Sequence, residues 1–167
     1  MFGGRSGTAR RAATVASFGF GATLLFLAST ANQYGYFTFG LAPGMYLATF
    51  RPAAGALVSG LAYFSAELLR GVGPNPNDSL LWALALAGLT AAFGVLAGRC
   101  AGSCLPLGMT VVIVTTSLVA SGTMIGPSVG AFGHHTFSDF LIAAASTAFA
   151  AVAYRKRLIP DGMARWA

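Results

Sequence analysis

The sequence is poor in charged residues. Only 8% of its 167 residues are Asp, Glu, Lys or Arg, whereas an ordinary soluble domain carries about 25%. With 56% hydrophobic residues and a mean hydropathy of +0.71, the chain has too little polar surface to cover a water-soluble fold of this size. The apolar runs are long rather than alternating, so the composition predicts an all-α integral membrane protein.

Acidic residues, cysteines and catalytic motifs are also scarce. The chain has four acidic residues and two cysteines, and it contains no P-loop, dinucleotide fingerprint or nucleophile–base arrangement. Cys100 and Cys104 form C-x-x-x-C, which is not the spacing of redox or zinc motifs, so we expect two small buried or interfacial thiols. No charge falls in the middle of an apolar run, although coupled transporters usually need one. We therefore expect no enzyme, no catalytic residue, no metal and no cofactor, but bound lipids.

The apolar segments predict a bundle of five to six transmembrane helices. Residues 37–50 form a short segment that contains Pro43, so it either crosses in a tilted or kinked form or re-enters the membrane. Arg51-Pro52 is expected to be the turn that follows it, because Pro suits the first turn of a helix. The other segments have about the 20 residues that a crossing requires; they are 12–31, 52–69, 79–98, 105–125 and 137–154.

The breaks and the ends of the chain complete this division. Residues 99–103 are expected to form a tight polar turn. Residues 12–157 would then be a single transmembrane domain, with a basic arm at 1–11 and a polar tail at 158–167. The arm has three arginines and no acid, which is typical of a mitochondrial or plastid transit peptide and equally of a positive-inside anchor.

The basic residues favour six spans over five. Basic residues concentrate on the inner side of a membrane. Six spans place both termini on one side and only Arg70 opposite, whereas five spans divide the ten basic residues four against six. Nine basic residues then share a side. Seven of them would mark the membrane edge, namely Arg10, Arg11, Arg51, Arg99, Arg155, Lys156 and Arg157, and the other two are Arg5 and Arg165.

Small residues four positions apart are the most repeated pattern. This spacing lets two helix backbones approach closely, which is a main source of helix association in lipid. We expect packing inside the bundle, with a docking face for another subunit as the alternative. The pairs are Gly40/Gly44, Gly55/Ser59, Gly94/Gly98 and Gly98/Gly102.

A few polar residues could carry chemistry. Glu67 lies three residues before Arg70, so an interfacial ion pair is expected, with a proton or cation site as the alternative. His134-His135 with Asp139 could hold a metal or haem, but adjacent histidines are a poor ligand set without further partners. We expect a solvated loop there.

Several motifs between residues 35 and 125 occur in a characteristic order. They are Gly40-x-x-x-Gly44, Tyr46, Pro52 at a helix start, a Pro/Asn loop at 74–77, Gly98-Arg99 and Pro106-Leu107-Gly108. In this order they resemble the transmembrane protein 14 family, small Gly-rich proteins of mitochondrial and plastid membranes. The resemblance implies a role in moving fatty acids or porphyrin precursors, and it implies no functional residues. Asn77-Asp78 and the following glycines also resemble the four-helix inner-membrane translocase family.

These features predict a non-catalytic accessory subunit of a large organelle membrane complex, acting in assembly and helix packing. A mitochondrial inner-membrane respiratory or ATP synthase complex is the first expectation, and a thylakoid photosystem is the second. The partners would be other membrane subunits and lipids, not nucleic acid. The alternative is a small carrier of lipidic cargo, which would show a cavity with a lateral opening lined by Gly and Ala.

Overall fold

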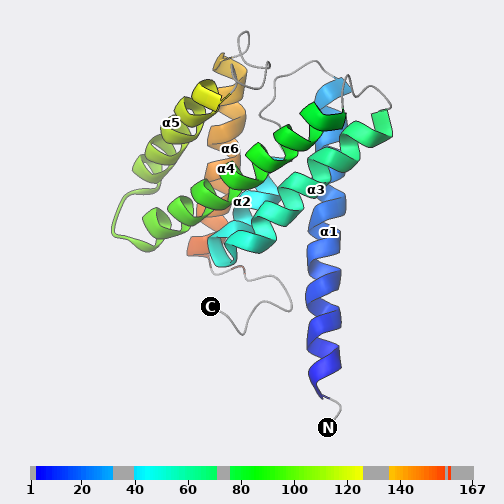
Figure 1. The fold of residues 1–167 in the computed structure, drawn as a ribbon. Coiled ribbons are helices and arrows are strands. Elements are labelled where there is room, and N and C mark those ends of the chain that lie inside the picture. Colours follow the sequence, from blue (N-terminus) through cyan, green and yellow to red (C-terminus); the bar gives the residue numbers. More distant parts are fainter. Residues whose placement is uncertain (1–2, 32–39, 71–75, 126–135, 157, 159–167) are drawn as a thin grey trace.

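The structure, a computed structural model, describes residues 3–31, 40–70, 76–125, 136–156 and 158. These residues fold into helices without any strand (Figure 1), which confirms the all-α class. The six helices are α1 Gly3–Ala31, α2 Leu41–Phe50, α3 Pro52–Arg70, α4 Pro76–Gly102, α5 Leu107–Ile125 and α6 Thr136–Arg155.

Three helices of the described part are long enough and apolar enough to cross a membrane. They are Gly7–Ala28 within α1, Pro52–Leu69 within α3 and Leu80–Gly102 within α4. The apolar stretches of α5 and α6 are shorter, Leu107–Ser121 and Phe140–Arg155. Length and composition are therefore those of a membrane protein.

Helix α2 is a short core helix. Its ten residues span about 15 Å, half of the roughly 30 Å hydrocarbon core of a bilayer. Six of them are buried, and α2 contacts α1, α3, α4 and α6. The described part of the predicted segment 37–50 is therefore enclosed by longer helices; residues 37–39 lie outside the described residues.

The predicted turn at Arg51-Pro52 is confirmed. Arg51 has extended backbone angles, φ −144° and ψ 103°, which the clash with a following proline favours. Its N–H donates to the Leu47 carbonyl at 2.8 Å, and its carbonyl accepts from the Gly55 N–H at 3.1 Å. One residue therefore ends α2 and begins α3.

The predicted turn at 99–103 is wrong in its bounds, and α1 is longer than the predicted first span. α1 begins at Gly3, so the described part of the basic arm continues into the first span, and Ala9, Arg10 and Arg11 at this junction are good helix formers. α4 continues through Arg99 to Gly102, because a cation in the last turn is favoured by the helix dipole. The turn starts instead at Ser103, whose hydroxyl donates to the Cys100 carbonyl at 2.6 Å.

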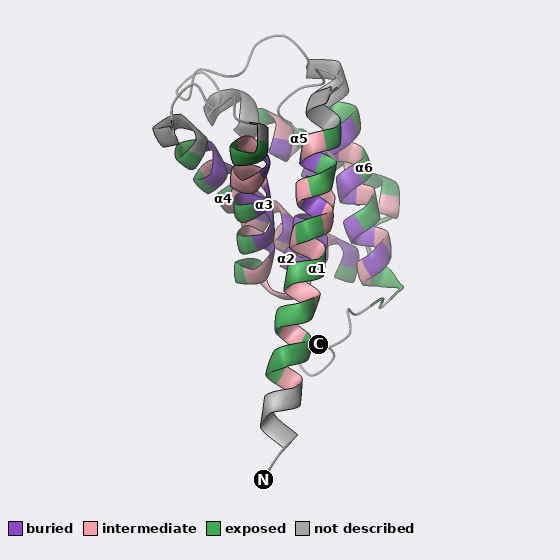
Figure 2. Ribbon diagram, turned by 90° about the vertical axis from the view of Figure 1, so that its right-hand side faces the viewer, coloured by how far each residue is buried: buried purple, intermediate pink, exposed green. Residues whose placement is uncertain are grey.

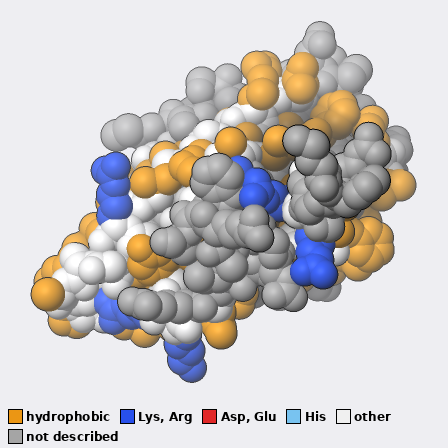
Figure 3. Space-filling model, turned by 90° about the horizontal axis from the view of Figure 1, so that it is seen from below, with side chains coloured by type: hydrophobic (Ala, Val, Ile, Leu, Met, Phe, Trp, Pro, Cys, Tyr) orange, Lys and Arg blue, Asp and Glu red, His pale blue; other side chains and the backbone are white. Residues whose placement is uncertain are grey.

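Most of the described basic residues gather at one end of the molecule, whereas Arg70, the last residue of α3, lies at the other end (Figure 1). α2, α4 and α6 finish there, while α1, α3 and α5 begin there (Figure 1). The rings of Phe50 and Tyr154, from α2 and α6, lie 5.6 Å apart. Figure 3 shows Lys and Arg side chains across this face. We call it the basic end; its described basic residues are Arg10, Arg11, Arg51, Arg99, Arg155 and Lys156.

Burial is concentrated where α2 meets its neighbours, and the outer faces of the helices are exposed (Figure 2). Large apolar side chains cover these outer faces, among them Leu61 on α3, Leu84 on α4 and Phe149 on α6. An apolar exterior around a packed interior is what a lipid environment requires.

Candidate functional site

Glycines from three helices meet around α2. A Cβ atom at Gly44 would lie 2.9 Å from the Thr90 methyl carbon and 3.1 Å from the Gly55 carbonyl oxygen. A Cβ at Gly55 or at Gly94 would collide with Ala48. These positions need glycine because the backbones of α2, α3 and α4 approach too closely for a side chain.

The remaining predicted packing residues lie around this contact. The Ser59 hydroxyl is buried and donates to the Gly55 carbonyl at 3.1 Å, so its polarity is satisfied within α3. A Cβ at Gly40 would collide with the Phe26 ring. Two glycines of α4 are less confined. A Cβ at Gly98 would lie 3.3 Å from the Thr49 Cβ, and one at Gly102 would lie 3.5 Å from the Tyr154 ring.

The structure therefore brings together Gly44, Gly55, Ser59 and Gly94, which we call the small-residue contact. Gly40, Gly98 and Gly102 each meet a different neighbour. Helices α2, α3 and α4 of this chain fill the small-residue contact themselves.

Arg155 ties the C-terminal end of α6 to the turn between α4 and α5. Its Nε donates to the Ala101 carbonyl at 3.2 Å, and Nη2 donates to the Leu105 carbonyl. These carbonyls lie at a helix end and in a turn, where they lack helical partners. Arg155 therefore has a structural role in addition to the predicted place at the membrane edge.

Other predicted residues stay as predictions. Glu67 lies half-buried on α3, but the side chains of Arg70 and Asp139 lie outside the described residues, as do Arg157, His134 and His135. Cys100 is half-buried, Cys104 is exposed, and both are free thiols.

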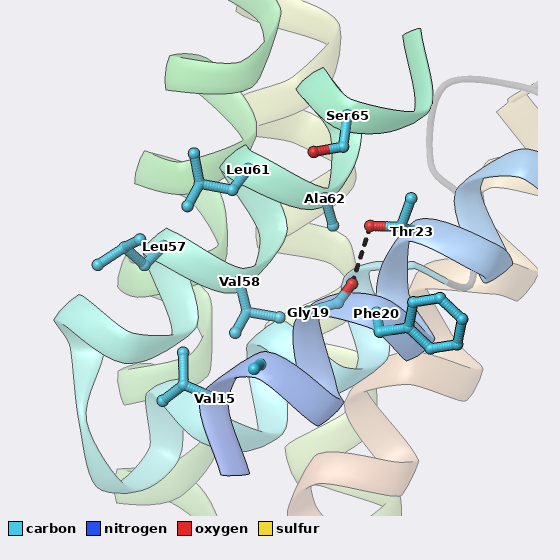
Figure 4. Close-up of a pocket in the computed structure, with 10 residues that line it drawn as sticks. Val15, Gly19, Phe20, Thr23, Leu57, Val58, Leu61, Ala62 and Ser65 are labelled. Carbon is cyan, nitrogen blue, oxygen red and sulfur yellow. Dashed lines mark hydrogen bonds between the residues drawn. The ribbon is translucent and has the colours of Figure 1, made fainter. Parts of the chain in front are cut away.

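A lateral groove between α1 and α3 was not expected from the sequence. It encloses 240 Å³ and opens to the side of the bundle (Figure 4). The Thr23 hydroxyl donates to the Gly19 carbonyl at 2.9 Å, so its polarity is satisfied on α1. The walls carry no charged side chain; they are Val15, Ala16, Gly19, Phe20 and Thr23 of α1 and Leu57, Val58, Leu61, Ala62 and Ser65 of α3.

The groove includes several small residues, Ala16 and Gly19 on α1 and Ala62 and Ser65 on α3. A Cβ at Gly19 would meet nothing within 4 Å. Above the groove, Phe26 is buried and its ring packs edge-on against Tyr63, with the ring centres 5.6 Å apart. The i, i+4 series Val15, Gly19, Thr23 is the sequence signal that could have indicated this face.

No protein-family model, curated protein or solved structure matches this chain. The likeness to the transmembrane protein 14 family thus stays a prediction.

Proposed function

We propose that this chain is a non-catalytic accessory subunit of a large organelle membrane complex. A mitochondrial inner-membrane respiratory or ATP synthase complex is the first candidate, and a thylakoid photosystem is the second. The chain would contribute helix packing and assembly surface, not chemistry. In this proposal all six helices lie in the membrane, α2 is enclosed by the others, and both termini face the same side.

The observation that carries the proposal is the exposure of α1. In the most apolar 18 residues of each helix, 11% are buried in α1, compared with 33% in α3 and 39% in α4. Phe20, Leu24 and Leu25 of α1 are 69%, 49% and 38% exposed. Among the described helices, α1 contacts α2 and α3, and its remaining described surface is available to lipid or to other subunits.

The basic end supports the proposed orientation. Basic residues lie at four places there: in the N-terminal part of α1, at the junction of α2 with α3, and at the C-terminal ends of α4 and α6. α3 ends with Arg70 at the opposite end of the molecule. The positive-inside bias then places the basic end in the matrix, stroma or cytosol.

Blue-native electrophoresis after gentle detergent extraction tests the proposal. We expect the chain to migrate with a large complex and to stay there after a mild wash. Replacing Leu24 and Leu25 by Ala on α1 should release it several-fold more readily than replacing Leu80 and Leu81 of α4, which are at least as exposed. Migration of the wild-type chain as a small monomer or dimer would sink the subunit proposal.

A carrier of lipidic cargo is the second candidate, and the lateral groove is the feature that favours it. The groove volume of 240 Å³ is below the roughly 300–1,000 Å³ of pockets that enclose drug-sized ligands. A linear acyl chain suits this space better than a porphyrin does. Transport of labelled fatty acid into vesicles that contain only this protein would support the carrier.

A further inference from the structure

The α1–α3 groove has the dimensions of one lipid chain. It covers Val15 to Thr23 on α1 and Leu57 to Ser65 on α3, nine residues of each helix. Nine residues rise about 12 Å along a helix, and one leaflet contributes about 15 Å, half of the roughly 30 Å hydrocarbon core. The groove opens sideways (Figure 4), in the direction from which a membrane lipid would enter.

Both walls of the groove lead to arginines at the basic end. α1 and α3 both start at that end. Arg11 precedes Val15 by four residues, and Arg51 precedes Leu57 by six, so the two arginines lie about 6 and 9 Å along the axes from the groove. Residues four apart share a helix face, which places Arg11 in line with Val15, Gly19 and Thr23.

The surroundings of these two arginines differ from those of other basic residues. Arg11 and Arg51 are half-buried, whereas Arg10 and Arg99 are exposed. Basic pockets between membrane helices on the inner side bind anionic lipid headgroups. An apolar groove with positive charge at its inner-side end is complementary to a phospholipid that has a negative headgroup.

We propose that this groove holds one acyl chain of an anionic phospholipid, with its phosphate beside Arg11 and Arg51. The phosphate accepts hydrogen bonds from the guanidinium groups, and the chain covers the apolar walls. The lipid would thereby fill the space that the side chains of α1 and α3 leave open. This site is independent of whether the chain belongs to a complex, since every residue of it comes from α1, from α3 or from the residue that precedes α3.

The test uses the full-length protein in phosphatidylcholine nanodiscs. The nanodiscs contain a trace of either phosphatidylglycerol or phosphatidylcholine that carries a diazirine on one acyl chain. After photolysis, the adducts on the protein are mapped by mass spectrometry. We expect phosphatidylglycerol adducts on Val15–Thr23 and Leu57–Ser65 to exceed phosphatidylcholine adducts at least about fivefold. A factor of about five corresponds to the roughly 1 kcal/mol that one arginine near the membrane surface contributes to the binding of an anionic lipid. Equal labelling by both lipids would overturn the proposal.

Two glycines of α1 provide a matched pair of variants. A Cβ at Gly19 or at Gly21 meets nothing within 4 Å, so both positions of α1 should tolerate leucine. Of the two, Gly19 lines the groove. Gly19→Leu should remove most groove adducts, and Gly21→Leu should keep them. Unchanged labelling of Gly19→Leu would contradict the site.

The headgroup is tested separately. Arg11→Gln and Arg51→Gln should each reduce the preference for phosphatidylglycerol about fivefold, while Arg11→Lys and the exposed control Arg99→Gln should keep it. If a glutamine variant fails to fold, the glycine pair still decides. A photo-crosslinker at residue 20 in native membranes should capture lipid; capture of a protein helix instead would overturn the proposal.

Discussion

Helix α3 makes two contacts that differ in kind. On the side of α2, Gly44 and Gly55 bring the two backbones so close that a single added carbon would collide, and Gly94 of α4 meets α2 in the same way. On the side of α1, Gly19 faces open space within a groove. Glycine is thus required in the first contact and optional in the second. In lipid, where packing is a main source of association, the first contact should hold the bundle together and the second should remain open to lipid.

The largest effect should come from Gly94→Ala. The new Cβ would collide with Ala48 and lie 2.8 Å from the Met45 carbonyl oxygen, so we expect the free energy of unfolding to fall by about 3 kcal/mol. Titration of micelles with a denaturing detergent, followed by circular dichroism, measures it. Gly88→Ala is the matched control in α4, because its Cβ meets nothing within 4 Å; it should gain about 0.5 kcal/mol.

A double variant sharpens the assignment. Ala48→Gly removes one atom of the collision, so combining it with Gly94→Ala should recover part of the lost stability. Additive losses from the two substitutions would show that they do not interact, and the close approach would then be wrong.

Phe26→Ala should have the next largest effect. Phe26 is 1% exposed and joins the upper part of α1 to Tyr63 of α3. We expect a loss of about 2 kcal/mol in the free energy of unfolding, less than the roughly 3–5 kcal/mol of a buried aromatic in a water-soluble core, because little transfer energy is gained in lipid. Phe20→Ala, on the same helix but 69% exposed, is the control and should change little. Similar losses for both would mean that α1 is held along its whole length.

Arg155→Met should have a smaller effect, at the turn between α4 and α5. It removes the hydrogen bonds to the Ala101 and Leu105 carbonyls. Because Arg155 is exposed, we expect only about 1 kcal/mol of lost stability and faster hydrogen exchange at 101–106. Lys156→Met removes the same charge from the next residue and should leave the exchange unchanged.

The smallest effect on stability should come from Gly19→Leu. The side chain enters an open groove, and leucine favours a helix over glycine, so the free energy of unfolding should change by no more than about 0.5 kcal/mol. A loss as large as that of Gly94→Ala would remove the distinction between the small-residue contact and the groove.

The sequence predicted the helices where breakers were clear. Pro52 marks the start of α3, and the predicted start of α5 at residue 105 differs from the observed Leu107 by two positions. The sequence predicts Arg99 in a turn, whereas the structure keeps it in α4, because a cation suits the last helical turn. The small-xxx-small spacing pointed to Gly44, Gly55 and Gly94, but it did not show which helices they join. The groove was missed because it depends on the relative placement of α1 and α3, which no local pattern encodes.

The proposed membrane arrangement requires that the basic end lies on one side of the bilayer, and site-directed thiol labelling tests this most directly. Cys104 is exposed at the basic end, and Leu69 is 71% exposed near the other end of α3. In sealed vesicles, a membrane-impermeant maleimide should label Cys104 of a Cys100→Ser protein from one side only. In a second variant, Cys100 and Cys104 are replaced by Ser and Leu69 is replaced by Cys. The maleimide should label this variant only from the other side. Labelling of both positions from the same side would contradict the arrangement.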